Sequence, residues 1–562
     1  MSAPGVDDAL LARARVWASE DPDPATRTEL ESLITAAETD PAAATELTDA
    51  FAGRLQFGTA GLRGKLGPGP NRMNRVVVSQ AAAGLAAHLL ATAPSAHHDQ
   101  QDGRPAGRGR VIIGWDARHN SEIFARDTAE IMAGAGFEAL LFDQHLPTPL
   151  VPYVIKKLEC VAGVVVTASH NPPADNGYKV YLDDGSQIVP PADAEIAAQI
   201  ARVAARPLAD IARSSDVIMV GQDLVDAYVA RTAAALSDGP REVRWVHTAL
   251  HGVGAPVMEQ AALAAGFSAP ISVAAQREPD PEFPTVDFPN PEEPGAIDAA
   301  LATAAEHDAD VVIANDPDAD RCAVAIRRNG EWAMLRGDQV GALLGDAALR
   351  RKERGVYAAS VVSSSLLSEM AAAHGQPYVT TLTGFKWIGR VEGLAFGYEE
   401  ALGYCCDPAA VADKDGISAA LRVLELAAAE KSAGRTLADR LDDIDREYGI
   451  HATDQLAVRV EDLSLITAAM DRIRNQPPKE LLGSQVAVVD LAEGSDDLPP
   501  TDGVWLSGDC FSVVVRPSGT EPKLKCYLEV RRGVDRDLAA DRAKANETLA
   551  TLKAEMQQAL GL

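Results

Sequence analysis

The chain has 562 residues, with 81 Asp and Glu against 52 Lys and Arg, a formal net charge of −29 and 47% hydrophobic residues. At roughly 150 residues per domain, this length predicts about three to four domains. So acidic a surface disfavours nucleic acid and anionic membranes as partners. It also repels phosphorylated metabolites at long range, so a phosphate site needs a local cluster of Arg and Lys.

The first residues carry charges where a signal peptide needs an apolar core, and no uncharged apolar run reaches membrane-spanning length. None of the cysteines forms a C-x-x-C pair, which favours buried or incidental thiols in a reducing compartment. We therefore expect a soluble cytoplasmic protein. The six cysteines are Cys160, Cys322, Cys405, Cys406, Cys510 and Cys526.

The amino-terminal half alternates between apolar runs and helical segments. Residues 6–51 are Ala-rich and predict short helices ahead of the first domain. A Gly-rich loop with two cations follows at 55–67, and then an amphipathic helix over 76–91. Strands separated by helices indicate a parallel or mixed sheet with helices on both faces. The predicted strands of this first unit are 111–116, 139–143 and 161–169.

The same alternation restarts over 243–316 and again over 337–400, whereas the Pro-rich stretch 278–295 predicts an extended surface excursion. From about 448 the pattern changes to strands and a closing helix. We predict an α/β protein with three similar mixed-sheet α/β domains and a smaller C-terminal α+β domain. The expected boundaries are 1–50 for a helical extension, then 51–215, 216–325, 326–447 and 448–562.

Ser169 lies in the segment TASHNP, directly after an apolar strand. Ligands of open α/β sheets bind at the carboxyl ends of strands, so Ser169 is a candidate nucleophile. A hydrolase elbow is excluded because the serine lacks the flanking glycines of G-x-S-x-G. Taken alone, the segment is explained better as a Ser/Asn/Pro turn. Lys179 follows close enough to supply a cation beside the serine.

Three carboxylates alternate in the segment DPDADR: Asp316, Asp318 and Asp320. Such a loop suits an oxygen-preferring ion such as Mg²⁺. An EF-hand does not fit, because its sixth and twelfth positions are Arg321 and Arg327. A solvated acidic turn is disfavoured because like charges so close repel one another. A phosphate on Ser169 would complete the shell of the ion.

Two further loops offer groups that bind sugars and phosphates. Glu399, in GYEEALG, could accept hydrogen bonds from sugar hydroxyls, although a paired Glu on a loop is usually just solvated. The segment RPSGTEPK combines a guanidinium, hydroxyls and a glycine, which is the chemistry of a phosphate site; a Pro/Gly-rich hairpin turn explains it equally well. Its candidate residues are Arg516, Ser518, Gly519 and Thr520.

Together and in this order, the four segments resemble the phosphoserine, metal, sugar and phosphate loops of the α-D-phosphohexomutase superfamily. GTAGLRG (58–64), WDARHNS (115–121) and DKDG (413–416) extend the resemblance over most of the chain. TGFKWIG (383–389) and GYEEALGY resemble its phosphoglucomutase, phosphopentomutase and glucose 1,6-bisphosphate synthase branch. Ala401 departs from the Ser of many hexose phosphoglucomutases, which weakens the inference about the sugar.

The resemblance implies four domains around one cleft, with a mobile fourth domain. It implies a phosphosugar mutase that interconverts sugar 1-phosphate and sugar 6-phosphate, glucose first, through phospho-Ser169 and a bisphosphate intermediate. Phosphomannomutase, phosphopentomutase, sugar bisphosphate synthase and a non-catalytic sugar-phosphate sensor remain alternatives. The implied cofactors are Mg²⁺, held by Ser169 and the three aspartates, and a sugar bisphosphate activator. The oligomeric state stays open.

The resemblance also implies roles for the remaining candidates. Lys179, His170 and Lys414 are candidate proton carriers, because a desolvated lysine among cations would have a lowered pKa and could act as a base. Lys179 is favoured because its spacing from Ser169 keeps it on the same loop system. Arg63, Arg118 and Arg321 would stabilise charge, since arginine does not give up its proton. Lys386 is as readily a surface lysine as a site residue. The expected substrate-binding residues are Arg118, Lys386, Glu399, Arg516, Ser518, Gly519 and Thr520.

Overall fold

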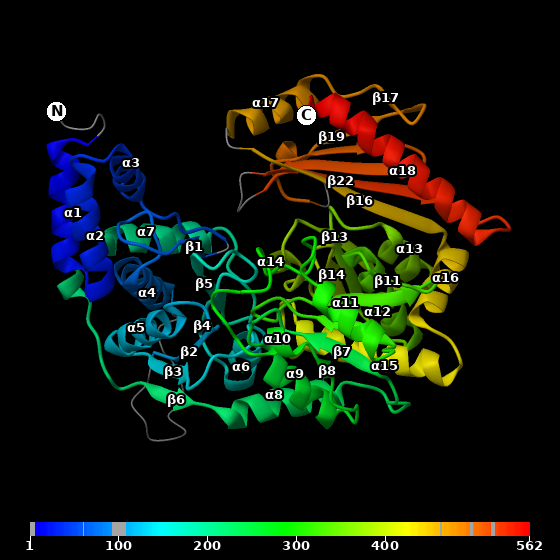
Figure 1. Cartoon of the computed structure of the whole chain (residues 1–562), viewed down its shortest axis with the longest axis horizontal. Coiled ribbons are helices and arrows are strands. Elements are labelled where there is room, and N and C mark those ends of the chain that lie inside the picture. Colours follow the sequence, from blue (N-terminus) through cyan, green and yellow to red (C-terminus); the bar gives the residue numbers. More distant parts are fainter. Residues whose placement is uncertain are drawn as a thin grey trace. The chain divides into compact units, whose positions relative to one another are not determined.

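The computed structural model of the chain divides into two compact units, coloured along the sequence in Figure 1. The first unit consists of Met1–Ser237, Arg244–Cys322 and Ala409–Leu421, and the second of Asp238–Val243, Ala323–Pro408 and Arg422–Leu562. The residues that the structure describes are 6–59, 61–92, 108–460, 463–494, 498–518 and 523–561.

Three helices open the chain, as the Ala-rich composition predicts: α1 (Asp8–Glu20), α2 (Pro24–Ala37) and α3 (Pro41–Ala50). Each begins after an aspartate whose side chain accepts a backbone N–H of the first turn, and α2 and α3 start with proline. Both features favour helix initiation. The helices bury a shared apolar cluster that includes Leu30 and Leu47.

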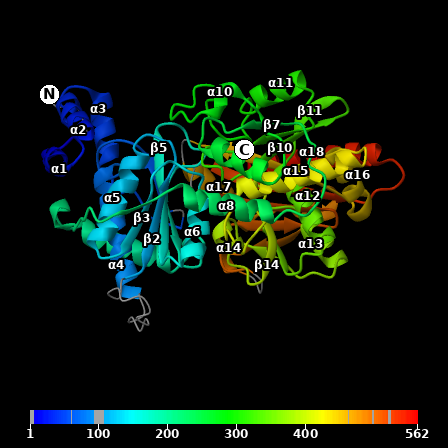
Figure 2. The same ribbon diagram turned by 90° about the horizontal axis from the view of Figure 1, so that it is seen from below.

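The first sheet has the order β1-β5-β4-β2-β3-β6. Strands β2, β3, β4 and β6 run parallel, whereas β5 is antiparallel to β1 and β4. Helices cover both faces: α5 lies on one side of β2 and β3 and α6 on the other (Figure 2). Its elements are β1 (Leu62–Lys65), α4 (Arg75–Thr92), β2 (Arg110–Trp115), α5 (Ser121–Gly134), β3 (Glu138–Phe142), α6 (Leu150–Leu158), β4 (Ala162–Val166), β5 (Asp175–Leu182), α7 (Ala192–Ala204), η1 (Leu208–Asp210) and β6 (Ile218–Val220).

Helix α4 corrects the prediction of an amphipathic helix over 76–91. Most of its side chains are buried, including the polar Ser79, Gln80 and His88, because α5 and α7 both pack against it. Among the described residues it is also the one helix that is long and apolar enough to span a membrane, and 67% of that window is buried inside the protein. Burial on several sides is typical of a core helix.

The first unit continues with a second set of parallel strands, in which β7 pairs with β8 and with β9. Residues 278–297, all of them described, form turns and extended chain without a helix or strand, as the prolines predict. The elements are α8 (Gln222–Ala234), β7 (Trp245–Thr248), α9 (Gly254–Ala264), β8 (Ile271–Ser272), α10 (Ala274–Arg277), α11 (Asp298–Glu306) and β9 (Val311–Ala314).

The second unit opens with the antiparallel pair β10–β11 and the sheet β13-β12-β14-β15. An ion pair between Arg440 and Asp346 joins two of its helices, α16 and α12. The elements are β10 (Ala323–Arg328), β11 (Glu331–Met334), α12 (Gly337–Arg350), β12 (Val356–Ser360), α13 (Leu366–Ala373), β13 (Tyr378–Thr381), α14 (Phe385–Ile388), β14 (Leu394–Glu399), β15 (Gly403–Cys405), α15 (Gly416–Ser432), whose first turns belong to the first unit, and α16 (Leu437–Tyr448).

The C-terminal region is an antiparallel sheet, β16-β22-β21-β20-β19, with helices α17 and α18 packed on it. Leu552 and Met556 of α18 share an apolar core with Val513 and Leu528 of the sheet. This is the smaller α+β region that the sequence predicts. The elements are β16 (Ile450–Arg459), α17 (Leu463–Asn475), β17 (Glu480–Leu481), β18 (Ser484–Gln485), β19 (Ala487–Asp490), η2 (Leu491–Glu493), β20 (Val504–Ser507), β21 (Phe511–Pro517), β22 (Lys523–Arg532) and α18 (Leu538–Leu560).

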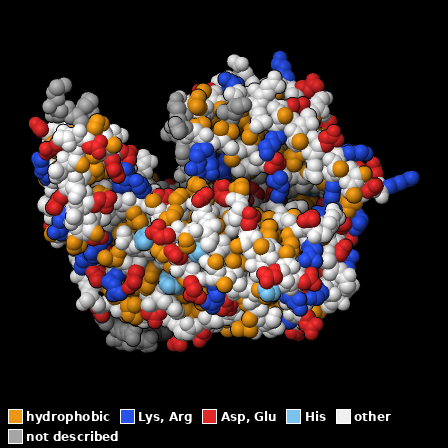
Figure 3. Space-filling view, viewed as in Figure 1, with side chains coloured by type: hydrophobic (Ala, Val, Ile, Leu, Met, Phe, Trp, Pro, Cys, Tyr) orange, Lys and Arg blue, Asp and Glu red, His pale blue; other side chains and the backbone are white. Residues whose placement is uncertain are grey.

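The state of the cysteines and the distribution of surface charge can be compared with what the composition predicts. All six cysteines are free, and only Cys510 among them is partly exposed, which confirms that they are not disulfide staples. Acidic and basic side chains are interspersed over the face seen in Figure 3. On that face the acidic side chains are therefore spread out rather than gathered in one patch.

Candidate functional site

Ser169 lies in the loop between β4 and β5 and is buried. Its φ of 51° is left-handed, a conformation that a non-glycine residue adopts at a cost. The backbone N–H of Ser169 donates to Thr167 Oγ1 at 2.9 Å, which helps to hold this turn. The Ser169 Oγ donates to Asp316 Oδ2 at 2.6 Å and lies 3.2 Å from His170 Nδ1. The serine hydroxyl is therefore aimed at the aspartate loop.

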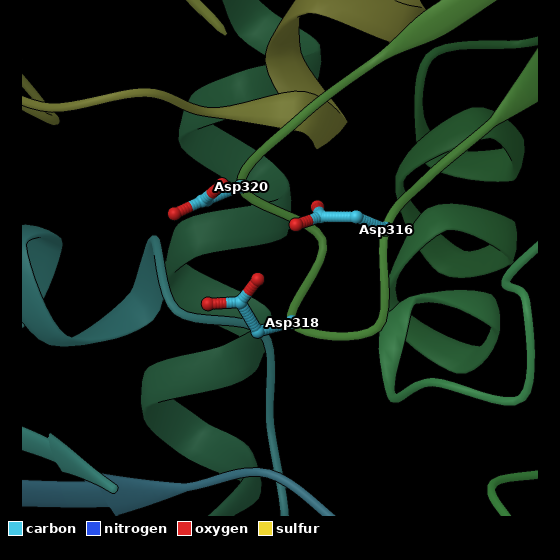
Figure 4. Close-up of side chains that lie close together, drawn as sticks. All are labelled: Asp316, Asp318 and Asp320. Atoms are coloured by element: carbon cyan, nitrogen blue, oxygen red, sulfur yellow. The ribbon is translucent and has the colours of Figure 1, made fainter. Parts of the chain in front are cut away.

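Asp316, Asp318 and Asp320 come from the loop that follows β9, and all three are buried. One carboxylate oxygen of each lies within 4.8 Å of the others, and the three side chains point toward a common space (Figure 4). Asp318 Oδ1 and Asp320 Oδ1 are buried without a hydrogen-bond partner among the described residues. Buried carboxylate oxygens need a partner, and an oxygen-preferring cation such as Mg²⁺ fits this donor set.

Two lysines neutralise part of this negative charge. Lys179, on β5, donates to Asp318 Oδ2 at 2.7 Å and to Asp320 Oδ2 at 2.8 Å. Lys414 Nζ lies 3.4 Å from Asp320 Oδ2 and 3.6 Å from Asp413 Oδ1. Both lysines are buried. Residues more than 200 positions apart thus meet at one cluster of carboxylates.

The pKa of Lys179 differs from the lowered value that the sequence suggests. Burial alone would lower the pKa of this lysine, but the charges of Asp318 and Asp320 raise it above its ordinary value. Burial, together with the charges of Arg321 and Arg63, lowers the pKa of His170 well below its usual range. The ammonium group of Lys179 thus faces two carboxylates, which outweigh the effects of burial and of the nearby Lys414, and the sequence could not reveal this balance.

Two arginines border the same loops. Arg63, on β1, donates to Asn171 Oδ1 at 3.2 Å, beside the serine. The Arg321 backbone N–H donates to Asp316 Oδ1 at 3.0 Å, and its Nε lies 3.8 Å from Asp320 Oδ1. Both arginines therefore border the serine loop and the aspartate loop.

Arg118 has partners other than the substrate that the sequence predicts. Its side chain is 1% exposed and forms an ion pair with Asp116 at 3.3 Å. Its guanidinium donates to backbone carbonyls of the serine loop instead of pointing to solvent. The accepting carbonyls belong to Ser169 (2.6 Å), Asn171 (2.6 Å), Pro172 (2.9 Å) and Asp175 (3.2 Å).

The remaining candidates belong to the second unit. Glu399 is buried at the end of β14, and Lys386 lies on α14 with a partly exposed side chain. Arg516 lies near the end of β21, and the backbone N–H of Ser518 donates to the Lys523 carbonyl at 2.8 Å. Gly519 and Thr520 lie outside the described residues. The roles of these residues stay predictions.

Sequence reasoning missed two groups that contact the cluster of site residues. Thr148 Oγ1 donates to Asp318 Oδ2 at 2.7 Å, and Asp413 accepts hydrogen bonds from Tyr181 and Gln187. Thr148 follows β3 and thus lies at a strand's carboxyl end, the same signal that pointed to Ser169. Asp413 lies in the segment DKDG, where only the lysine was singled out.

Comparisons with known proteins match almost the whole chain to one family. Models of phosphoglucomutase/phosphomannomutase match residues 54–207 (alpha/beta/alpha domain I), 226–330 (domain II), 336–448 (domain III) and 456–545 (C-terminal domain). These matches confirm the predicted fold class of three α/β domains and a smaller C-terminal domain. They also agree with the predicted order of the four segments.

Two curated relatives and one solved structure are similar to this chain over most of their length. A Haemophilus influenzae protein named "Probable phosphomannomutase" is 46% identical and covers 84% of this chain and 96% of its own. A Mus musculus phosphopentomutase is 34% identical, covering 94% of this chain and 91% of its own. The Paramecium parafusin structure, a phosphoglucomutase in open form, has a TM-score of 0.68 at 19% identity over 91% of this chain and 96% of its own, which shows the shared fold.

Proposed function

This chain belongs to the phosphoglucomutase/phosphomannomutase family, and we propose that it carries a phosphoryl group on Ser169 and moves it between two hydroxyls of a sugar. The observation that supports this most is the 2.6 Å hydrogen bond from Ser169 Oγ to Asp316 Oδ2. A nucleophilic oxygen and a cluster of three carboxylates share one buried site, which a plain Ser/Asn/Pro turn does not require.

In this proposal Asp316, Asp318 and Asp320 would hold a Mg²⁺ ion together with the phosphate on Ser169. Such an ion would supply positive charge to the phosphate oxygens. Thr148 and Lys179 orient the carboxylates of Asp318 and Asp320, because each donates a short hydrogen bond to them. Arg63 and Arg321 balance the charge of the phosphoryl group.

The transfer itself exchanges one P–O bond for another. The free hydroxyl of a sugar monophosphate attacks the phosphorus of phospho-Ser169, the bond from phosphorus to Ser169 Oγ breaks, and a sugar bisphosphate forms. The hydroxyl proton passes to a neutral base. Lys179, His170 and Lys414 are the candidates, and we favour His170, because its lowered pKa leaves the ring neutral whereas the raised pKa of Lys179 keeps that lysine protonated. The bisphosphate then returns its other phosphate to Ser169 and leaves the isomeric monophosphate. Burial of Ser169 limits hydrolysis by water.

Residues of the second unit would bind the part of the substrate that does not react. Arg516, Ser518, Gly519 and Thr520 would hold the existing phosphate, since a guanidinium and backbone N–H groups suit an anion. Glu399 would accept hydrogen bonds from ring hydroxyls, and Lys386 would contact the sugar. A sugar bisphosphate would prime the enzyme by phosphorylating Ser169.

We propose glucose 1-phosphate and glucose 6-phosphate as the substrate pair, because the segments 383–389 and 397–404 resemble those of the phosphoglucomutase and phosphopentomutase branch. Two specific observations favour other sugars: the relative at 46% identity is named a phosphomannomutase, and one at 34% identity is named a phosphopentomutase. Ala401 also lacks a hydroxyl that could contact the sugar. Accumulation of bisphosphate would indicate a synthase instead of a mutase.

The test is a comparison of kcat/KM on glucose, mannose and ribose 1-phosphates, with a trace of the matching bisphosphate. We expect turnover of glucose 1-phosphate to exceed that of the other two, and Ser169→Ala to remove all turnover. The exposed Ser432→Ala on α15 is the matched control and keeps full activity. Full mutase activity of Ser169→Ala would reject the proposal, whereas a preference for mannose or ribose would correct only the sugar.

A further inference from the structure

The Pro-rich segment 278–295 contacts Arg118, which in turn donates to the loop that carries Ser169. Phe283 of this segment is 2% exposed, and its ring centroid lies 4.9 Å from Cζ of Arg118. The neighbouring Glu282 pairs with His119, next to that arginine. The segment 278–295 forms no helix or strand, and it places the Phe283 ring against the Arg118 guanidinium.

The backbone around Phe283 is fixed in an unfavourable conformation. Its φ of 47° is left-handed, which is rare for an aromatic residue. Two backbone hydrogen bonds hold it: Phe283 N–H to the Asp280 carbonyl and Val286 N–H to the Phe283 carbonyl, both at 3.1 Å. The Asp280 N–H donates in turn to the His251 carbonyl at 3.0 Å. These hydrogen bonds hold the strained backbone of Phe283 in place, and they thereby fix the position of its ring.

Arg118, which the ring covers, connects four carbonyls of the serine loop through two of its nitrogens. The third nitrogen faces Asp116, whose own carboxylate accepts from Ser121 Oγ at 2.7 Å and from the Arg118 backbone N–H at 3.0 Å. A guanidinium offers five donors in a rigid fork, so no lysine could reproduce these contacts. Ser169 itself, with its left-handed φ, depends on the loop being held.

We infer that Arg118 and Phe283 form a positioning pair: Arg118 holds the backbone of residues 169–175, and Phe283 excludes water from the guanidinium and fixes its plane. The pair keeps Ser169 Oγ directed at Asp316. The kinetic consequence of this inference rests on the proposed function, whereas the contacts that hold the loop do not depend on it. It also gives the Pro-rich segment a role beyond that of a surface excursion.

The test uses Arg118→Lys and Phe283→Leu in the full-length protein, with Phe288→Leu as control. Phe288 lies in the same segment but is 37% exposed. Phe283→Leu keeps an apolar side chain and tests the pair even where Arg118→Lys fails to fold. Amide hydrogen exchange of the peptide covering residues 167–178 is measured without substrate, together with steady-state kinetics.

We expect exchange in this peptide to increase at least about threefold in both variants, because local opening sets exchange rates. We expect kcat to fall about 100-fold in Arg118→Lys and about 10-fold in Phe283→Leu with KM nearly unchanged, since misplacing a reacting group by about 1 Å has such an effect. Phe288→Leu should behave as the parent protein.

Unchanged exchange at 167–178 in Phe283→Leu would overturn the inference. So would a raised KM with unchanged kcat in Arg118→Lys, because that pattern indicates an arginine that binds substrate directly. Faster exchange in a protein that has no mutase activity would support the positioning pair and reject the proposed function, so the two can fail separately.

Discussion

His451, at the start of β16, is a buried histidine with carboxylates on both sides of its ring. Its Nδ1 lies 3.1 Å from Glu529 Oε1 and its Nε2 lies 3.5 Å from Glu369 Oε2. Ser365 Oγ lies 3.2 Å from the same Nδ1. Burial alone would lower the pKa of His451, but hydrogen bonds and charges of Glu369 and Glu529 raise it to about 9.

This residue gives a prediction of stability against pH. The pKa of His451 is about 9 in the folded protein and 6.5 ordinarily. The charged histidine therefore stabilises the folded state fully below pH 6.5, and this contribution is lost as the pH rises through 9. We expect His451→Gln to lower the free energy of unfolding by on the order of 2 kcal/mol at pH 6 and by much less at pH 10.

Thermal unfolding of both proteins at the two pH values provides the measurement. His374→Gln is the control, because this histidine is exposed at the end of α13. An equal difference in Tm between the parent protein and His451→Gln at pH 6 and pH 10 would show that the histidine is not charged in the folded state.

The residues of the site show how far the sequence alone could reach. Ser169 and Asp316 were predicted as partners from separate motifs, and they meet at 2.6 Å. Strand-end position and residue type made both residues candidates, and the resemblance of the four segments to known loops was needed to pair them. The contacts of Arg118 with Phe283 and with backbone carbonyls could not be predicted, because a sequence does not reveal which arginines are covered by an aromatic ring. The charge environment of Lys179 likewise depends on contacts between distant segments.

At the scale of elements, removal of metal tests whether the loop after β9, with Asp316, Asp318 and Asp320, holds an ion. We expect chelation by EDTA to abolish activity and Mg²⁺ to restore it, because three buried carboxylates so close together need a cation. Asp318→Asn should need at least about tenfold more Mg²⁺ for half-maximal activity, since a charged ligand is lost. Titration of activity with Mg²⁺ is the measurement.

The exposed Asp509→Asn of the same charge change is the control, and it should titrate as the parent protein does. Activity that persists after exhaustive chelation would contradict the metal role of the loop. Identical Mg²⁺ requirements for Asp318→Asn and the parent protein would argue that Asp318 orients other groups without holding the ion.

Helices and strands could be predicted where the local pattern of apolar residues indicated one type of element. The apolar runs 111–116 and 139–143 correspond to β2 and β3 within one residue. Helix α4 was predicted in place, but its amphipathic character was wrong, because α7 packs on a face that local sequence suggests is solvated. Tertiary contacts of this kind are absent from any single segment, so burial of α4 could not be derived from it.

At the scale of the whole molecule, the fold class followed from the repeated alternation of strands and helices. Four family matches in the same order confirm it. The preferred sugar could not be derived in this way. In our proposal it depends on a few side chains, among them Glu399 and the residue at position 401, and relatives that share the fold bear the names of different mutases.

Intact-mass analysis of the purified protein shows whether Ser169 carries the phosphoryl group. After incubation with a sugar bisphosphate, we expect a species heavier by one phosphate, mapped to the peptide with Ser169 and discharged by excess sugar monophosphate. Ser169→Ala should never gain this mass. A phosphate that maps to another residue, or one that the sugar monophosphate cannot remove, would show that Ser169 is not the carrier.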